Sequence, residues 1–307
     1  MDTTPNSLIT YGLEQLAEGV YAYLQPDGGW CLNNAGIVIG AENTLLIDTA
    51  ATEARALVLR ETVRTLSPRP VGTLVNTHSH GDHTFGNHLF SESATIVAHE
   101  RAAAEMAEYG LALRDLWPQV RWGHVEPTLP KVTYRERLSL PDLGARVELL
   151  HVGPGHTAGD TVVWLPDERV LFTGDLVFSG ATPFVLMGSL TGSLHALDRL
   201  RELEPLHVVP GHGPLGGPEL LDANVDYLRW VDQLAGTGIA EGLAPLDLAR
   251  AVGPGPYGQL LDSERLVGNL VRAYAERHGA QPAAPLDVRA AFEDIVALHG
   301  SLPHCGA

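Results

Sequence analysis

The apolar residues in the first half of the chain switch between strand-like and helix-like spacing. Helical spacing over residues 51–66 and 100–109 predicts two helices, and Pro68 ends the first of them. A further helix is expected to begin at residue 81 and to extend to about residue 90. Short apolar or alternating runs predict strands at residues 19–24, 34–40, 44–47, 71–76 and 94–98.

The same alternation returns in the second half. Residues 191–203 and 217–235 have helical spacing, and residues 207–209 form a short apolar run between them. Two strand pairs are predicted before these helices, 132–140 with 145–152 and 161–165 with 169–173, each around a Pro-Asp turn. Two rounds of strands and helices favour two sheets packed together with helices outside, an αββα four-layer sandwich of the α/β class.

Beyond Gly236 the chain reads as helical to its end. Helices are predicted over residues 245–252, 263–278 and 286–299, with prolines between them. We therefore expect a main domain of residues 1–239 and a helical C-terminal extension of residues 240–307 packed on it. Segment 111–131 places Trp117 and Trp122 among prolines, which is typical either of a lid or pocket wall or of a surface loop with packed tryptophans.

The charge and composition of the chain limit the kinds of partner that it can bind. The chain has 37 acidic and 20 basic residues, a formal net charge of −17, which disfavours nucleic acid and anionic membranes. No run approaches a membrane span, and residues 1–16 lack the pattern of a signal peptide. Cys31 and Cys305 do not make a disulfide framework, so reduced thiols and a cytoplasmic location are expected.

A cluster of metal-binding residue types follows the apolar run 71–75. His78, His80, Asp82 and His83 fall within six residues. Neutral imidazole and carboxylate are the usual protein ligands of zinc-like metals. On a turn that leaves a strand, His78 and His80 can point one way while Asp82 and His83 point another. This spacing favours two neighbouring metals.

Two metal sites need more ligands than these four. His156, Asp175 and His212 each follow a strand-like run and lie on a glycine-rich turn. Small residues on such turns let the backbone approach a cluster closely. All three are therefore candidate ligands.

Taken together, these motifs resemble the metallo-β-lactamase superfamily. H-x-H-x-D-H, G-H-T, T-G-D and P-G-H-G occur in this order over roughly residues 15–235, and the segment 45–49 is similar to the family's first motif. The resemblance implies the αββα fold and a dinuclear metal centre. It implies that one metal is held by His78, His80 and His156, the other by Asp82, His83 and His212, and that Asp175 bridges them.

The resemblance also implies supporting roles. Asp82 would orient a metal-bound hydroxide, and Asp48 and Thr157 would fix the rotamers of ligands. Two zinc ions are the expected cofactors, although nitrogen and oxygen ligands also admit manganese or iron. Such metals polarise a carbonyl and lower the pKa of a bound water to about 7.

Three features distinguish the chain within the superfamily. A bridging Asp175 argues against lactam hydrolysis, because the β-lactamases of this fold do not use one there. Only 36 residues separate Asp175 from His212, too few for the inserted domain of the RNA-processing nucleases. The oxygen-reducing flavo-diiron members have glutamate where His80 stands.

A closer resemblance involves residues 29–36 (GWCLNNAG), 180–184 and 266–270. These stretches resemble an actinobacterial subgroup that includes second-ring cyclases of aromatic (type II) polyketides. The resemblance implies aldol cyclisation and dehydration of a polyketide bound to an acyl carrier protein, with release of the thioester. The alternatives are a general thioester, ester or lactone hydrolase and a non-catalytic metal-binding module. The protein could also form a homodimer. The residues expected to form the walls of a pocket for a flat substrate are Trp30, Trp117, Trp122, Phe178 and Phe184.

Overall fold

The computed structural model describes residues 9–140, 143 and 145–307. Within that part of the chain the strands form two sheets. The five-stranded sheet has the order β12 (His207–Val209), β11 (Val170–Phe172), β10 (Val162–Leu165), β9 (Val147–Leu150), β8 (Arg137–Leu140). The seven-stranded sheet follows chain order: β1 (Gly12–Ala17), β2 (Val20–Leu24), β3 (Ala35–Ile39), β4 (Thr44–Ile47), β5 (Val71–Val75), β6 (Thr95–His99) and β7 (Val132–Tyr134).

The first sheet changes from antiparallel to parallel at β4. Strands β1 to β4 form antiparallel pairs, whereas β4–β5, β5–β6 and β6–β7 are parallel. Helix α1 (Glu53–Leu66) makes the crossover from β4 to β5, and the side chain of Thr52 caps its N-terminus by accepting from the Arg55 N–H. Helix α3 (Glu100–Tyr109) lies in the connection from β6 to β7. The parallel strands bring their carboxyl ends, and the loops that follow, to one edge.

The two sheets pack face to face. Val38 and Leu45 of the first sheet share a buried core with Leu149 and Phe172 of the second. Gly36 lies so close to the Phe172 ring that an added Cβ would come within 2.6 Å of it. Side-chain bulk is therefore excluded at this point between the sheets.

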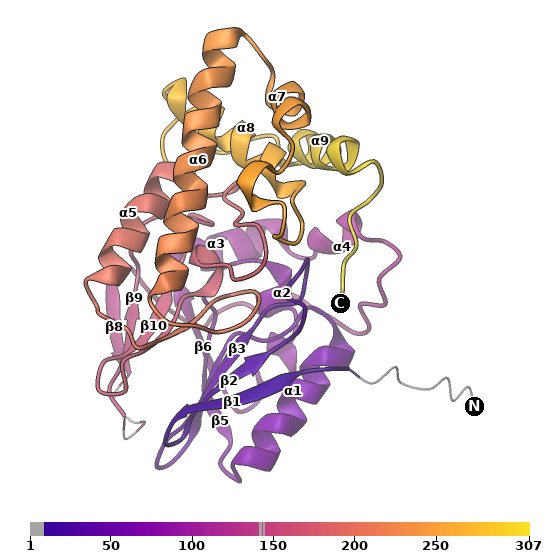
Figure 1. Cartoon of the computed structure of the whole chain (residues 1–307). Coiled ribbons are helices and arrows are strands. Elements are labelled where there is room, and N and C mark those ends of the chain that lie inside the picture. The colour runs from indigo at the N-terminus through magenta and orange to yellow at the C-terminus, as the bar shows by residue number, and fades with distance from the viewer. Residues whose placement is uncertain (1–8, 141–142, 144) are drawn as a thin grey trace.

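Helices cover both outer faces. Leu59 of α1 packs on Leu74 and Ile96 of the first sheet. Leu197 of α5 (Leu190–Arg201) and Val225 of α6 (Glu219–Glu241) belong to the cluster that covers the second sheet. The predicted αββα sandwich is thus confirmed (Figure 1).

The remaining helices gather at one end of the molecule (Figure 1). Helix α8 (Arg265–Arg277) contacts α5, α6, α7 (Pro245–Val252) and α9 (Val288–His299). Helix α6 runs through the predicted boundary at 239/240 and ends at Gly242, which has a left-handed backbone. The division into two domains stays a prediction. None of the described helices is long and apolar enough to cross a membrane.

Several element predictions were wrong. The single strand predicted at 132–140 is two strands, because the chain leaves the first sheet after Tyr134 and enters the second at Arg137. The helix expected from 81 to 90 is a short turn, α2 (Gly81–Thr84), and a 3-10 turn, η1 (Asn87–Leu89). Edge strand β1, whose middle is polar and exposed, was not predicted. The turn expected around 141–142 lies outside the described residues.

Segment 111–131 is irregular, as expected, apart from the short helix α4 (Leu113–Leu116). A 3-10 turn, η2 (Gly174–Leu176), carries Asp175, and another, η3 (Gly255–Tyr257), precedes α8.

Candidate metal centre

The predicted ligands lie on loops that follow strands of both sheets. His78 to His83 follow β5, His156 follows β9, Asp175 follows β11 and His212 follows β12. Asp82 and His83 stand in the short helix α2, and the His83 ring lies 4.2 Å from the ring of His78 in the preceding loop. The strand ends thus bring together residues that lie far apart in the sequence.

The seven side chains form two groups that could each hold a metal ion. Within each group the possible ligand atoms lie within 4.8 Å of one another. All the members are buried except the partly buried His80. The first group is His78, His80, His156 and Asp175, and the second is Asp82, His83 and His212.

Asp175 lies between the two groups. Its Oδ2 is 3.3 Å from Nε2 of His156 in the first group and 3.4 Å from Nε2 of His212 in the second. Its Oδ1 is 3.2 Å from Nε2 of His83. A single carboxylate therefore reaches both groups, which is the position a bridging ligand requires.

The outer nitrogens of three ligand histidines are hydrogen-bonded to other groups. Nδ1 of His83 lies 2.8 Å from Oδ2 of Asp48, Nδ1 of His156 lies 2.5 Å from the Phe184 carbonyl, and Nδ1 of His212 lies 3.2 Å from the Gly29 carbonyl. Each bond places the proton on Nδ1 and leaves Nε2 facing the centre. These hydrogen bonds fix the orientation of the three rings at the centre.

His78 and His80 complete the arrangement. Nδ1 of His78 lies 3.1 Å from the Thr77 hydroxyl. His80 is turned the other way: its Nδ1 is 2.8 Å from Nε2 of His156, and its Nε2 is 3.2 Å from the sulfur of Met187. The less buried side of the site is therefore bordered by His80 and Met187.

Some atoms at the centre have unmet bonding capacity. Nε2 of His78 is buried without a hydrogen-bond partner among the described residues. Nε2 of His83 and Oδ1 of Asp175 face each other at 3.2 Å, but neither atom has a hydrogen bond of suitable geometry among these residues. Buried polar atoms are costly when unpaired. Imidazole nitrogen and carboxylate oxygen are zinc ligands, so metal ions fit the donor set.

The charges at the site also favour a cation. Burial disfavours a charged His212, yet Asp175 and Asp82 outweigh it and raise the pKa of His212 to about 9. Burial likewise opposes ionisation of Asp82, but His83 and His212 lower its pKa to about 2. Burial lowers the pKa of His80 to about 3, which keeps that ring in the neutral form that binds metal.

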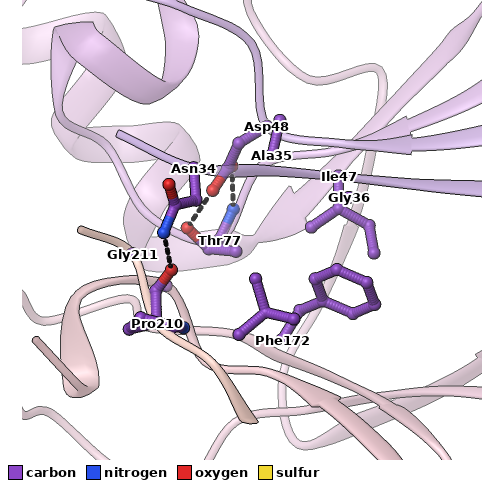
Figure 2. Close-up of a pocket in the computed structure, with 11 residues that line it drawn as sticks. Asn34, Ala35, Gly36, Ile47, Asp48, Thr77, Phe172, Pro210 and Gly211 are labelled. Atoms are coloured by element: carbon purple, nitrogen blue, oxygen red, sulfur yellow. Dashed lines mark hydrogen bonds between the residues drawn. The ribbon is translucent and has the colours of Figure 1, made fainter. Parts of the chain in front are cut away.

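Asp48 supports the centre from between the sheets. Its carboxylate accepts from the backbone N–H of Thr77 (2.7 Å) and from the Thr77 hydroxyl (2.6 Å), as Figure 2 shows. It also contacts His83. Asp48 therefore links the strand β4 loop to both metal groups. The Thr157 hydroxyl donates to Asp160 at 2.7 Å. A role of Thr157 in fixing a ligand rotamer stays a prediction.

Sequence reasoning missed two supporting residues. Asp160 accepts from the backbone N–H groups of Gly155 and Thr157, which fixes the loop that carries His156. Asn34 donates to the carbonyls of Pro210 (2.9 Å, Figure 2) and Gly213 (2.7 Å), which fixes the loop of His212. The signal for each was a polar residue beside a glycine-rich turn.

The aromatic residues expected to form a pocket lie at different depths. The ring of Phe178 stacks on His212 at 5.3 Å, and Trp30 packs edge-on to Phe184 at 5.3 Å. Trp117 and Trp122 are buried, and their indole N–H groups donate to the carbonyls of Pro303 and Trp117. A wall role for these five residues stays a prediction.

Comparison with known proteins identifies the family. Residues 28–212, more than half of the chain, match the model of the metallo-beta-lactamase superfamily. The chain belongs to this superfamily, whose members are mostly metal-dependent hydrolases that typically bind zinc.

Its relatives carry out different reactions. The chain is 31% identical over 176 residues to the 2,4-dinitroanisole O-demethylase subunit alpha of Nocardioides sp. (strain JS1661), covering 56% of this chain and only 50% of that protein. It is 28% identical over 220 residues to the metallo-beta-lactamase type 2 of Bacteroides fragilis, covering 68% and 82%. It is 32% identical over 136 residues to the hydroxyacylglutathione hydrolase of Methylococcus capsulatus, covering 43% and 44%.

Solved structures support the fold. The metallo-beta-lactamase from Pontibacter korlensis superposes with a TM-score of 0.59 at 24% identity and covers 72% of this chain and 99% of its own. The DIM-1 metallo-beta-lactamase superposes with a TM-score of 0.58 at 23% identity, and the match covers 72% of this chain and 97% of that one.

Proposed function

We propose that this protein is a dinuclear zinc enzyme that acts on a carbonyl substrate. The observation that carries the proposal is Asp175, whose carboxylate lies 3.2 to 3.4 Å from ligand nitrogens of both groups. Bound zinc would supply Lewis acidity and acidify water at neutral pH. The first ion would be held by His78, His80 and His156, and the second by Asp82, His83 and His212.

Within this centre Asp82 has the best position to orient a reacting water. Its side chain is 11% exposed, against 5% for the side chain of Asp175. Its Oδ2 is 3.3 Å from Nε2 of His212. Asp82 would therefore combine metal binding with orientation of the nucleophile or base.

For the substrate we propose a polyketide carried on an acyl carrier protein. Methylene groups between carbonyls are acidic, so removal of one proton allows aldol attack on another carbonyl of the same chain, which closes the ring. Loss of water from the aldol product follows, and hydrolysis of the thioester frees the acid from the carrier protein. The GWCLNNAG stretch, residues 29–36, supports this choice by its resemblance to the cyclase subgroup. Phe178, which stacks on His212, and Trp30, which packs on Phe184, are suited to a flat intermediate.

The second candidate is simple hydrolysis of a thioester, ester or lactone. It is favoured by the likeness to hydroxyacylglutathione hydrolase and to metallo-beta-lactamases. Non-catalytic metal binding is the remote alternative. The free thiols of Cys31 and Cys305 support a reducing compartment such as the cytoplasm.

The test uses N-acetylcysteamine thioesters of poly-β-keto acids, whose further ketones can accept an aldol attack, as probes with the zinc-loaded protein. Thiol release is followed with a chromogenic thiol reagent, and products are identified by mass spectrometry. A product that has lost one water relative to the free acid supports cyclisation, whereas the free acid alone supports hydrolysis. No reaction with either thioesters or simple esters and lactones would contradict both candidates.

A further inference from the structure

Helix α8 carries a buried polar stripe toward the metal centre. Arg265, Asn269 and Arg272 stand at positions i, i+4 and i+7, so they lie on one face of the helix. Each is at most 1% exposed. Buried charged and amide groups are costly unless they are bonded, so their partners indicate what this face is for.

The stripe binds the backbone of segment 182–187. Arg265 donates to the Thr182 carbonyl at 2.9 Å, and Arg272 donates to the Leu186 carbonyl at 2.7 and 2.9 Å. Asn269 lies between them and binds on both sides of Phe184. It donates to the Pro183 carbonyl at 2.8 Å and accepts from the Val185 N–H at 2.9 Å.

Segment 182–187 in turn contacts the first metal group. The Phe184 carbonyl lies 2.5 Å from Nδ1 of His156, and the sulfur of Met187 lies 3.2 Å from Nε2 of His80. The two bonds from Asn269 to the neighbours of Phe184 fix the direction of its carbonyl. Because that carbonyl orients the His156 ring, Asn269 acts on the ligand through one peptide group.

The start of α8 reaches the second group by another route. Glu264, which is 6% exposed, accepts from the indole N–H of Trp30 at 2.7 Å. The Arg265 guanidinium lies 4.1 Å from the centre of the same indole. The carbonyl of Gly29, the residue before Trp30, accepts from Nδ1 of His212 at 3.2 Å.

The turn at residues 29–32 makes this second link rigid. The Gly29 carbonyl also accepts from the Leu32 N–H at 3.1 Å, so its direction is fixed within the turn. The C-terminal tail adds a bond from the Gly306 N–H to the Trp30 carbonyl at 3.0 Å. Trp30 is therefore held by its side chain and by its backbone.

We propose that Asn269 and the Trp30–Glu264 pair are positioning residues of the metal centre. Asn269 orients His156 through the Phe184 carbonyl, and Trp30 with Glu264 orients His212 through the Gly29 carbonyl. The C-terminal extension is thus part of the support of both metal groups. This inference depends on the proposed dinuclear centre, and it gives a physical role to residues 180–184 and 266–270, which bond to each other.

The test measures zinc affinity by competition with a chromogenic chelator in backgrounds that each lack one ligand. In a His212→Ala protein, Asn269→Leu should weaken zinc binding about tenfold to a hundredfold. In a His156→Ala protein the same change should have little effect, because the ring that Asn269 orients is gone. Trp30→Phe should show the reverse pattern. It should weaken zinc binding in the His156→Ala protein, which keeps His212, and have little effect in the His212→Ala protein.

Controls separate positioning from general damage. Glu276→Gln alters a carboxylate of α8 whose hydrogen bonds go to Leu190 and Thr191 and not to a metal ligand; the zinc affinity of this variant should match wild type. If Asn269→Leu does not fold, Asn269→Asp replaces it in the test, because it keeps an acceptor for the Val185 N–H. Glu264→Gln likewise keeps an acceptor for the Trp30 indole N–H. Glu264→Gln should bind zinc more tightly than Glu264→Ala.

The outcomes distinguish this inference from the proposed function. Equal losses in both backgrounds, or no loss in either, would overturn the positioning role while leaving the metal centre intact. A wild-type protein that binds no zinc, manganese or iron would instead remove the proposed function, and the positioning role with it.

Discussion

Oδ2 of Asp48 lies 2.8 Å from Nδ1 of His83, a ring 35 positions later in the sequence. The same carboxylate holds the backbone and hydroxyl of Thr77, beside His78. Asp48 has a φ of 61°, a left-handed conformation uncommon for aspartate, so the loop after β4 is shaped to present it. One buried carboxylate therefore supports ligands of both groups.

Replacing that carboxylate should weaken metal binding. Asp48→Asn keeps the size of the side chain but removes the charged acceptor of His83, so zinc affinity should fall about tenfold to a hundredfold. Competition with a chelator measures the change. Asp198→Asn, on the exposed surface of α5, is the matched control and should leave affinity unchanged. Wild-type affinity in Asp48→Asn would show that the contact is not needed to orient His83.

The contact between Gly36 and Phe172 predicts a stability effect. Gly36→Ala would place a Cβ within 2.6 Å of the Phe172 ring and 2.8 Å of the Ile47 side chain, in the core between the sheets. Such overpacking should cost about 1–3 kcal/mol in the free energy of unfolding. Chemical denaturation measures it, with Gly12→Ala as the control, since its Cβ would meet nothing closer than 3.7 Å. Equal stability of the two variants would be inconsistent with a tight contact at Gly36.

Glu148 predicts a pH dependence of stability. Hydrogen bonds from Arg137, together with Ser139 and Arg146, outweigh its burial and lower the pKa of Glu148 to about 2. The pKa in the unfolded chain is about 4.3, so the stabilisation is complete above that value and is lost as the pH falls toward 2. Since both arginines are more than half exposed, water screens the pairs and the contribution is about 1 kcal/mol.

The measurement compares unfolding of wild type and Glu148→Gln from pH 7 to pH 2. The difference in unfolding free energy should be constant down to about pH 5 and then shrink. Glu61→Gln, which removes only an exposed pair with Arg64, is the control and should change stability less. A difference between wild type and Glu148→Gln that grows at low pH would contradict the assigned pKa shift.

The fold was largely predictable because its strands are short apolar runs bounded by turns. Residues 44–47 and 207–209 match β4 and β12, and helix α3 has the predicted bounds. The break between β7 and β8 was not visible, because no glycine, proline, asparagine or aspartate marks the corner at Arg135 and Glu136. Which sheet a strand joins depends on tertiary packing, and that is absent from local periodicity.

In the candidate site, too, the local features could be predicted from the sequence and the long-range contacts could not. His78 to His83 are neighbours in the sequence, so their shared chemistry was visible before the structure. The bond from Trp30 to Glu264 spans 234 positions, and nothing in either segment alone indicates it. Cys31 and Cys305 lie near opposite ends of the sequence, yet the folded tail brings the two buried thiols into contact. Long-range contacts of this kind follow from how the C-terminal helices pack.

The most direct test of the account is elemental analysis of protein purified without chelator, with Asp175→Ala alongside. We predict about two zinc ions per chain in the wild type and a clear loss in the variant, because the Asp175 carboxylate reaches both groups. Asp167→Ala, in an exposed turn, should retain the wild-type content. One metal ion or none in the wild type, or an undiminished pair in Asp175→Ala, would contradict the bridged dinuclear centre.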